Sequence, residues 1–548
     1  MKITIAQIKV RTLRCEENFS KIKECVIKAK EDNCDMIIFP ANVISGYLLG
    51  SNYLNNNELK LIDSYNNIIK EFAVDIAVVW GNIKYRGNKL FNCIFYAFGN
   101  EIHTRVLCDN DMLQMNKEYF SFSDIKSCIH YKGESIYLTS KDDIMENSLN
   151  IILDNNYYQG EQIKYIDANV IYVNSLGMQN VNKNIVYYYG GSYVANNSSV
   201  YSLGLYEENL MVYDTNVSLK NRKDKISKLD VLINCIKDFD EVIFNKSVNW
   251  VIGLSGGLDS TINAALLVAA LGSKRVIGYN LASNYNSQLT KDNAKQTATN
   301  LGVEYRCGNI EELKQSTIAT LQTYGYKEKD MSTLAIENIQ ARLRGHLLSS
   351  FASLVSGVVC NNGNKVEVAL GYCTLYGDSI GAIAPLADLT KVDLFEISHE
   401  LNKYFNAEVV PLSLLPKVNN DSIIWEMPPS AELKDKQFDP MKWFYHDKLI
   451  EIYLQDGNLD KVVVQYDKDK LKTLKLDKWI TYYKLHDREL FIKDINWLVK
   501  TMNINGFKRL QLPPIIVMSK YAYGNKIEEV QGVETKQYKW GLYGKNRW

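Results

Sequence analysis

The sequence predicts an α/β protein with two halves: a strand-rich layered half, then a half built on a doubly wound parallel sheet. Three observations support this prediction. The chain has 548 residues, of which 46% are apolar, which is enough for two large domains with buried cores. In the second half, predicted strands alternate with helices of the length that parallel βαβ units require. A Gly-rich turn at residues 255–260 joins one of these strands to the next helix.

The first half, to about residue 215, reads as short strands with intervening helices. Apolar residues in alternation or in short runs predict strands, and apolar residues at three- and four-residue spacing predict helices. Strands are predicted at 2–7, 36–39, 76–82, 102–107, 135–138, 150–153, 170–173 and 210–213, and helices at 18–31 and 57–72. The resulting pattern is that of a layered α/β domain.

A polar segment at about 218–228, followed by a helix to about residue 245, introduces the second half. We therefore divide the chain into a first domain at 1–217, a linker with a connecting helix at 218–245, and a second domain at 246–548. Within the second domain, strands are predicted from 250, at 275–279 and at 303–307, and helices at 291–301 and 331–354. Ligands of doubly wound sheets bind beyond the carboxyl ends of the strands, where the turn at 255–260 would lie.

Composition favours small-molecule chemistry. Lys plus Arg equals Asp plus Glu at 63 each, so no overall field attracts nucleic acid or an anionic membrane. The ten cysteines include no CxxC pair, which indicates reduced thiols and neither a zinc site nor a disulfide framework. The chain starts without a signal-peptide pattern, and no apolar run reaches the about 20 residues of a membrane span. We expect a cytoplasmic protein without nucleic-acid or membrane partners.

The turn at 255–260 has the features of a polyphosphate-binding loop. Gly256 and Gly257 allow close approach of a ligand to backbone N–H groups, and the following helix directs its positive dipole end toward the same place. Ser255 and Ser260 add hydroxyl donors, whereas Asp259 would repel phosphate unless a divalent cation lay between them. The residues predicted to bind ATP here are Gly253, Leu254, Ser255, Gly256, Gly257, Leu258, Asp259 and Ser260.

No Lys follows the second Gly, so this is not a Walker A loop. The loop resembles the SGGxDS motif of the N-type ATP pyrophosphatases, which break ATP between its α- and β-phosphates. The alternative is an ordinary Gly-rich turn between a strand and a helix. Because strand, turn and helix all occur in the order that the motif needs, we favour the phosphate loop.

Further segments resemble those of the glutamine-dependent NAD synthetases, in the same order and at matching spacing. They lie at 337–344, 363–367, 371–378, 428–433 and 507–511, the last being followed by two prolines. The resemblance implies an ATP pyrophosphatase (adenine nucleotide alpha hydrolase-like) domain. It also implies that ATP adenylates the carboxylate of deamido-NAD and that ammonia then displaces AMP to give NAD.

The same resemblance assigns roles to single residues. Asp259 and Glu367 would hold Mg²⁺, and Lys391 would contact the phosphates of ATP, so that Asp259 and Lys391 are the predicted catalytic residues. Asn362 and Ser430 would contact the nucleotide. The residues predicted around the dinucleotide are Asn338, Arg342, Glu367, Asp378 and Lys508. Taken singly, Arg342 with Arg344 also fits a solvated helix face, Asp378 a turn, and Lys508 a surface cation.

Several positions depart from the family pattern. Residues 362–367 read Asn-Gly-Asn-Lys-Val-Glu where the family has Thr-Gly-Asn-Lys-Ser-Glu, so two hydroxyls are lost. Residues 381–383 read Gly-Ala-Ile instead of Gly-Gly-Phe, and Val392 replaces a Thr. Asn362 retains an amide donor, whereas Val366 and Val392 retain none. These departures weigh on the identity of the acid substrate more than on the use of ATP.

The first half resembles the nitrilase-like domain that supplies such synthetases with ammonia from glutamine, which implies an α-β-β-α sandwich. The segments at 37–47, 172–174 and 190–193 carry this resemblance. The chemistry requires a Glu base, a Lys and a Cys nucleophile, and these positions hold Ala41, Arg105 and Lys141. Since a methyl group accepts no proton, we expect no glutamine hydrolysis and a scaffold or assembly role instead.

Three cysteines of this half, Cys93, Cys108 and Cys128, lack the neighbours that a replacement nucleophile would need. Tyr189 also replaces an Asp of the family pattern. The ammonia would then come from solution or from a separate donor protein, and the resemblance implies a homo-oligomer.

Three readings of function remain open at this point. The first is an ammonia-using ligase of the NAD synthetase type. The second is a paralogue with the same adenylation chemistry that acts on a different acid or with an amine or sulfur nucleophile. The third is a non-catalytic nucleotide-binding or assembly protein. The complete loop with Glu367 and Lys391 argues against the third reading.

Overall fold

The computed structural model describes residues 1–99, 101–107, 119–121, 127–196, 199–418, 423–427, 439–524, 529–532 and 534–539. The chain forms two compact units, Met1–Asp238 and Phe239–Trp548. The division falls inside helix α3 (Lys228–Phe244), which lies within the segment 218–245 that we assigned to the linker and connecting helix. None of the helices in the described ranges has the length and apolar character that a membrane span requires.

The first unit contains two six-stranded sheets. One has the order β14-β1-β2-β3-β4-β5, with β1, β2 and β3 parallel to one another, and the other has the order β13-β12-β9-β8-β7-β6. The first sheet consists of β1 (Lys2–Gln7), β2 (Met36–Ile38), β3 (Ala77–Arg86), β4 (Lys89–Phe98), β5 (Glu101–Val106) and β14 (Asn209–Asp214). The second consists of β6 (Ser127–Tyr131), β7 (Glu134–Leu138), β8 (Leu149–Asp154), β9 (Val170–Asn174), β12 (Tyr193–Asn196) and β13 (Ser199–Ser202). Between β9 and β12 in sequence lies a hairpin of β10 (Leu176–Val181) and β11 (Asn184–Tyr189).

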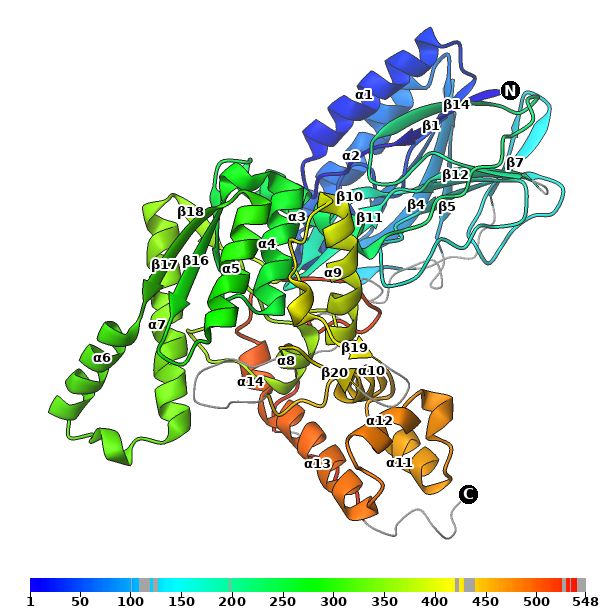
Figure 1. The fold of residues 1–548 in the computed structure, drawn as a ribbon. Coiled ribbons are helices and arrows are strands. Elements are labelled where there is room, and N and C mark those ends of the chain that lie inside the picture. The colour runs from blue at the N-terminus through cyan, green and yellow to red at the C-terminus, as the bar shows by residue number, and fades with distance from the viewer. Residues whose placement is uncertain are drawn as a thin grey trace. The chain divides into compact units, whose positions relative to one another are not determined.

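Alternation of side chains across the strands explains why these two sheets pack together. Ile3 and Ile5 of β1 share one buried core with Ile151 and Leu153 of β8 and with Val173 of β9. The opposite face of the first sheet is covered by α1 (Cys15–Glu31) and α2 (Asn56–Phe72), which lie side by side (Figure 1). The three layers of helix, sheet and sheet agree with the predicted sandwich.

The outer face of the second sheet is covered differently. The residues that alternate with its core positions, such as Ile152 and Tyr172, pack against Ile144, Ile163 and Tyr165. These covering residues belong to the segments before and after β8, at 144–148 and 155–168, which form no helix. The fourth layer of the sandwich is therefore irregular chain at this place.

The second unit is built on a four-stranded parallel sheet with the order β17-β16-β15-β18. Its strands are β15 (Asn249–Gly253), β16 (Val276–Ala282), β17 (Glu304–Asn309) and β18 (Gly357–Val359). Helices α4 (Leu258–Leu271) and α5 (Gln288–Leu301) follow β15 and β16 and contact the strands. On one face of the sheet, Val251 and Tyr279 pack against Leu348 and Phe351 of α7 (Thr333–Leu354). Helices therefore cover the sheet as a doubly wound fold requires.

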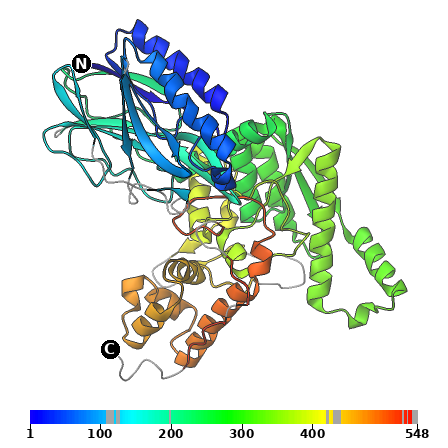
Figure 2. The same cartoon turned by 180° about the vertical axis from the view of Figure 1, so that it is seen from behind.

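A helical part completes the second unit. Its core gathers apolar residues of α8 (Lys365–Leu370), α10 (Tyr445–Asp456), α11 (Asp460–Asp467), α12 (Asp477–Tyr482) and α13 (Arg488–Ile504). Helix α9 (Lys391–Phe405) contacts α4. Seen from behind, the shorter α6 (Glu311–Thr323) and the adjoining end of α7 extend beyond the parallel sheet, whereas the rest of α7 packs on it (Figure 2).

Candidate active site

The predicted phosphate loop connects the carboxyl end of β15 to α4, and β15 lies between β16 and β18 in the sheet. Gly256 has a φ of +89°, and a Cβ built on it would lie 1.9 Å from the carbonyl oxygen of Thr290 in α5. Gly257 has a φ of −85° and precedes the first residue of α4. Gly256 is therefore required by the packing of α5, whereas Gly257 leaves space open in front of the helix N-terminus.

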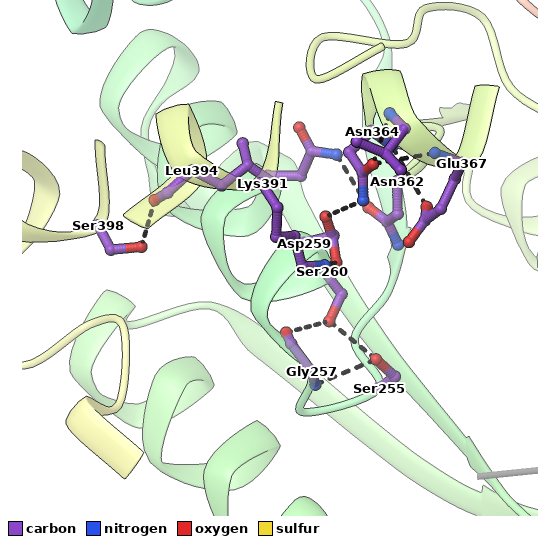
Figure 3. A network of polar contacts seen from close by, with 12 residues as sticks. Ser255, Gly257, Asp259, Ser260, Asn362, Asn364, Glu367, Lys391, Leu394 and Ser398 are labelled. Atoms are coloured by element: carbon purple, nitrogen blue, oxygen red, sulfur yellow. Dashed lines mark hydrogen bonds and ion pairs between the residues drawn. The ribbon is translucent and has the colours of Figure 1, made fainter. Parts of the chain in front are cut away.

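The hydroxyl groups of the loop bond to the loop itself (Figure 3). Ser255 Oγ lies 3.0 Å from Ser260 Oγ and accepts a hydrogen bond from the N–H of Gly257 at 3.2 Å. Ser260 Oγ also donates to the carbonyl oxygen of Gly257 at 3.0 Å. These bonds hold the turn in shape, so its backbone N–H groups are preorganised for an anion.

Asp259, in the first turn of α4, brings the loop into contact with two other elements (Figure 3). Its Oδ2 lies 2.6 Å from Nζ of Lys391, the first residue of α9. Its Oδ1 accepts a hydrogen bond from Nδ2 of Asn364 at 3.0 Å. The side chain of Asp259 is 19% exposed and that of Lys391 is 3% exposed, so the ion pair is largely shielded from water.

Lys391 is held through both its backbone and its side chain. Asp447 Oδ1 accepts a hydrogen bond from its backbone N–H at 2.7 Å, and Thr390 caps α9 directly before it. Its ammonium group lies 5.0 Å from the centre of the Trp443 ring. Burial alone would lower the pKa of Lys391, but the carboxylates of Asp259 and Glu367 outweigh burial and raise it. Lys391 is therefore a fixed positive charge in the site.

Glu367 occupies the first turn of α8, where Asn364 is the N-cap. The Asn364 side chain accepts from the N–H groups of Val366 and Glu367, and the Glu367 side chain accepts from the N–H of Asn364. Burial, together with the nearby charge of Asp259, raises the pKa of Glu367 to about 8. Asn364 thus orients both predicted metal-binding acids.

These residues line one cavity of about 340 Å³ in the second unit. The predicted site residues that line it are Gly253, Ser255, Gly257, Leu258, Asp259, Ser260, Asn362, Glu367, Asp378 and Lys391. Leu254 is fully buried behind the loop, and Gly256 packs against α5. Ser430 lies outside the described residues. The apolar walls include Tyr279, Leu348 and Ile380, as a small-molecule pocket usually has.

Three residues predicted around the dinucleotide lie beside the cavity and are not part of its lining. Asn338 Oδ1 accepts from the hydroxyl of Thr374 at 2.8 Å, and Arg342 Nε donates to the carbonyl of Leu375 at 3.3 Å. Lys508 Nζ donates to the carbonyls of Gly371 and Cys373, at 2.8 Å each. All three side chains brace residues 371–375, and their contact with a substrate stays a prediction.

Asp378 follows the segment 371–375 and bonds back to it. Its Oδ1 accepts a hydrogen bond from the N–H of Thr374 at 2.6 Å, as expected for a turn residue, and the side chain also lines the cavity. Burial raises the pKa of Asp378 to about 6. The turn reading and the site reading of Asp378 are therefore compatible.

The positions that depart from the family pattern have different surroundings. Asn362 Nδ2 donates to the carbonyl of Gly253 at 3.0 Å, and its Oδ1 accepts from Asn263 at 3.1 Å. Val366 is fully buried in the helical core, and neither it nor Val392 lines the cavity. In this conformation, the missing hydroxyls at 366 and 392 remove no group from the cavity wall.

Asn364 and Asp447 were not predicted from the sequence as site residues, and Arg344 was predicted only as part of a solvated helix face. Asn364 and Asp447 act through hydrogen bonds to residues distant in sequence, so local patterns carried no signal for them. Arg344 lines the cavity, unlike Arg342. A stripe of small and apolar residues, Ala341, Gly345 and Leu348, marks its side of α7 and could have indicated this.

The donor set fits a divalent cation of the Mg²⁺ type. Asp259 and Glu367 offer carboxylate oxygens beside a loop that fits phosphate, and Mg²⁺ in proteins is usually held by one or two carboxylates with phosphates and water. Among the described side chains, no group of three or more His, Cys, Asp or Glu residues is arranged to hold a metal by itself. A cation here would therefore depend on the phosphates of a nucleotide for part of its coordination.

In the first unit, each of the three positions aligned with the glutaminase residues makes a polar contact with a neighbouring residue. Arg105 Nη1 donates to the carbonyl of Leu138 at 2.6 Å, and Lys141 Nζ lies 2.5 Å from Asp154 Oδ2. The carbonyl of Ala41, which is 4% exposed, accepts from Ser175 Oγ at 3.4 Å. Arg105 and Lys141 thus serve as partners of neighbouring groups, whatever further role they have.

The cysteines of this unit do not suggest a substitute nucleophile. Cys93 is buried, and burial raises the pKa of its thiol to about 12, which disfavours the thiolate. Cys128 is exposed on β6, and Cys108 lies outside the described residues.

The fold and the cavity define the class of protein: a sandwich of the nitrilase type joined to a doubly wound α/β unit of the ATP pyrophosphatase type, as predicted. The model of the NAD synthase family matches residues 231–489. A glutamine-dependent NAD⁺ synthetase of Acinetobacter baylyi is 26% identical over 80% of this chain and 84% of its own length. One of Synechocystis is 25% identical over 95% of this chain and 97% of its own.

The second half of the chain thus matches the NAD synthase family, and most of the chain is similar to glutamine-dependent NAD synthetases, which confirms the predicted resemblance. The solved structure of such a synthetase from Acinetobacter baumannii, in complex with ADP, has the same fold. It superposes with a TM-score of 0.67 at 21% identity, covering 95% of this chain and 97% of that one.

Proposed function

We propose that the second unit is an ATP-dependent, amide-forming ligase that converts deamido-NAD and ammonia to NAD, with release of AMP and pyrophosphate. The observation that carries this proposal is the meeting of Asp259, Lys391 and Glu367 in one cavity at the end of β15. The match of residues 231–489 to the NAD synthase family supports the choice of substrate. The ADP in the Acinetobacter baumannii structure supports an adenine nucleotide as ligand.

The residues account for the steps of adenylation. The N–H groups of the loop at 255–260 and the N-terminus of α4 bind the polyphosphate of ATP, and Lys391 offsets part of its charge. A Mg²⁺ ion held by Asp259 and Glu367 would supply the remaining positive charge at the phosphates. An oxygen of the carboxylate attacks the α-phosphorus and pyrophosphate leaves. Ammonia then attacks the carbonyl carbon of the acyl adenylate, and AMP leaves.

Asp259 changes partners in this scheme. In the structure its Oδ2 contacts Lys391 at 2.6 Å, so the same oxygen cannot face a cation without moving from the ammonium group. A bound nucleotide would give Lys391 a phosphate partner, and Asp259 would then be available to hold the cation. The ion pair therefore keeps both charged groups compensated until ATP binds.

We propose further that the first unit does not hydrolyse glutamine, so that the ammonia comes from solution or from a separate donor protein. The support is Ala41 at the position of the general base, together with the raised pKa of the Cys93 thiol. Purified protein incubated with glutamine should release no glutamate above a blank without protein. Steady release that is abolished by changing one cysteine would refute this proposal. A homo-oligomeric, cytoplasmic enzyme stays a prediction, which sedimentation and fractionation would test.

One assay separates the readings of function. Purified protein is given ATP, Mg²⁺, deamido-NAD and ammonium, and AMP and NAD are measured by chromatography. NAD and AMP formed in equal amounts would support the proposal. AMP formed only with another acid would identify a paralogue of different specificity, and no nucleotide turnover with any acid would indicate a non-catalytic protein. The position of Val366 and Val392 away from the cavity wall favours the first outcome.

A further inference from the structure

One face of α7 forms a wall of the cavity. Its lining residues are Ala341, Arg344, Gly345 and Leu348, which follow the three- and four-residue spacing of one helix face. A Cβ on Gly345 would lie 2.5 Å from the carbonyl oxygen of Gly377, so α7 and the turn that ends at Asp378 pack backbone to backbone. This packing fixes where Arg344 enters the cavity.

The protein supplies a hydrogen-bond acceptor to one nitrogen of the Arg344 guanidinium group. Its Nε donates to the carbonyl of Leu281, at the end of β16, at 2.9 Å. Within the described ranges, Arg344 takes part in no ion pair closer than 4.0 Å, and its Nη atoms are not among the buried atoms that lack a partner. Because Arg344 lines the cavity and only its Nε donates to a backbone carbonyl of the described chain, its remaining N–H groups are the candidate donors for a ligand that enters the cavity.

The other cation of the cavity has a different status, because Lys391 already contacts Asp259 at 2.6 Å. Burial lowers the pKa of Arg344 to about 10. The negative charge of Asp378 acts in the opposite direction but does not cancel the effect of burial. A guanidinium group stays protonated at neutral pH under these conditions. The cavity therefore holds a positive charge that would be better compensated with an anion bound.

We propose that Arg344 binds an anionic oxygen of a reactant, either the α-phosphate of ATP or the carboxylate of the acid. The inference rests on the proposed function and adds a binding residue to it. A guanidinium group offers two parallel N–H donors, which match the paired oxygens of phosphate and carboxylate. Arg342 differs, because it is exposed and donates to the carbonyl of Leu375 outside the cavity lining.

The test uses the full-length protein and the variants Arg344→Gln and Arg344→Lys. Arg14→Gln, which removes an Arg whose side chain is 62% exposed on the first unit, is the matched control. Binding of Mg²⁺-ATP and of deamido-NAD is measured separately by calorimetry, and thermal unfolding checks the fold. Loss of a charge-assisted hydrogen bond predicts about tenfold or greater weakening for one of the two ligands in Arg344→Gln. Arg344→Lys should recover part of the affinity, and Arg14→Gln should equal the unchanged protein.

Each result has a defined meaning. Weakened ATP binding alone would identify the phosphate as the partner, and weakened deamido-NAD binding alone would identify the acid. Equal binding of both ligands by folded Arg344→Gln would overturn the inference and leave the proposed function intact. If Arg344→Gln does not fold, folded Arg344→Lys carries the same comparison, with about threefold weakening expected because the paired donors are lost. An unchanged protein that binds neither ligand would overturn both proposals.

Discussion

Lys391 Nζ lies 2.6 Å from Asp259 Oδ2, although the two residues lie in the first turns of different helices and are 132 positions apart in the chain. Helix α4 brings Asp259 to the end of β15, and the capped N-terminus of α9 brings Lys391 to the same place. Neither element by itself forms a charged site. The charged site therefore forms only when the fold of the second unit brings the two helix N-termini together.

The ion pair predicts separate effects on stability and activity. Asp259→Asn leaves Lys391 buried without its partner, so the free energy of unfolding should fall by about 1–3 kcal/mol. Lys391→Met should have a similar effect, and the double variant should be more stable than the sum of the single effects implies. All three should form AMP at least about 100-fold more slowly, because charge compensation at the phosphates is lost. Urea unfolding and AMP formation measure the two effects.

Asp292→Asn is the matched control, because Asp292 is exposed on α5 and does not line the cavity. It should change neither quantity. Unchanged AMP formation in Asp259→Asn would remove Asp259 from the proposed metal site.

Asn364 should matter more for activity than an ordinary helix cap does. Asn364→Ala removes the cap of α8 and the hydrogen bond to Asp259, whereas Asp487→Ala removes the cap of α13, which does not border the cavity. Both should lose about 1 kcal/mol of stability. Only Asn364→Ala should also slow AMP formation by about tenfold and raise the Mg²⁺ concentration needed for half-maximal rate. Equal turnover in the two variants would show that Asn364 acts as a cap alone.

The pKa of Glu367 predicts how stability depends on pH without nucleotide. Burial raises this pKa from 4.5 to about 8, so the folded protein keeps a proton that the unfolded chain releases in this range. The stabilising contribution is complete below pH 4.5 and is lost as the pH rises through 8. Glu367→Gln stays neutral, so it should gain about 3 kcal/mol over the unchanged protein between pH 5 and pH 8.

Urea unfolding at pH 5, 6.5 and 8 measures this difference. Glu400→Gln, at an exposed position of α9, is the control and should show no such trend. A difference for Glu367→Gln that stays constant or shrinks with rising pH would contradict the assigned protonation.

The two loop glycines should respond differently to the same substitution. Gly256→Ala places a methyl group against the Thr290 carbonyl at a φ of +89°, so it should cost about 2 kcal/mol or more of stability. At Gly257 the Cβ would meet only Ser255 Oγ, at 3.4 Å. Gly257→Ala should therefore keep its stability but bind ATP more weakly, because the methyl group stands where phosphate approaches. Thermal unfolding and ATP titration distinguish the two, and a stable Gly256→Ala would contradict the packing argument.

Local patterns predicted many elements and few long-range contacts. The strand predicted at 2–7 coincides with β1, and the helix predicted at 57–72 begins one residue earlier in α2 (Asn56–Phe72). The hairpin of β10 and β11 was not predicted, because the tyrosines of β11 are buried although their hydroxyls read as polar. The irregular layer over the second sheet also has no local signal, since irregular chain packs there where a helix was expected.

The residues of the site likewise fall into those that local sequence patterns predict and those that only long-range contacts determine. Gly256, Asp259 and Ser260 were recognisable because loop and helix are adjacent in sequence. The sequence could not show which of Arg342 and Arg344 lines the cavity. The two residues lie on different faces of α7, and the packing of α7 against the turn at Gly377 decides which face borders the cavity. The hydrogen bonds of Asn364 and Asp447 likewise arise only when separate helices meet.

In the proposed reaction, a carboxylate of the substrate attacks the α-phosphorus of ATP in the cavity that contains Asp259 and Lys391. Deamido-NAD labelled with ¹⁸O in its carboxylate, incubated with the protein, ATP, Mg²⁺ and ammonium, tests it directly by mass spectrometry of the products. We expect AMP that carries one ¹⁸O atom, together with NAD and unlabelled pyrophosphate. Cleavage of ATP to ADP and phosphate, or AMP without the label, would contradict the proposed reaction.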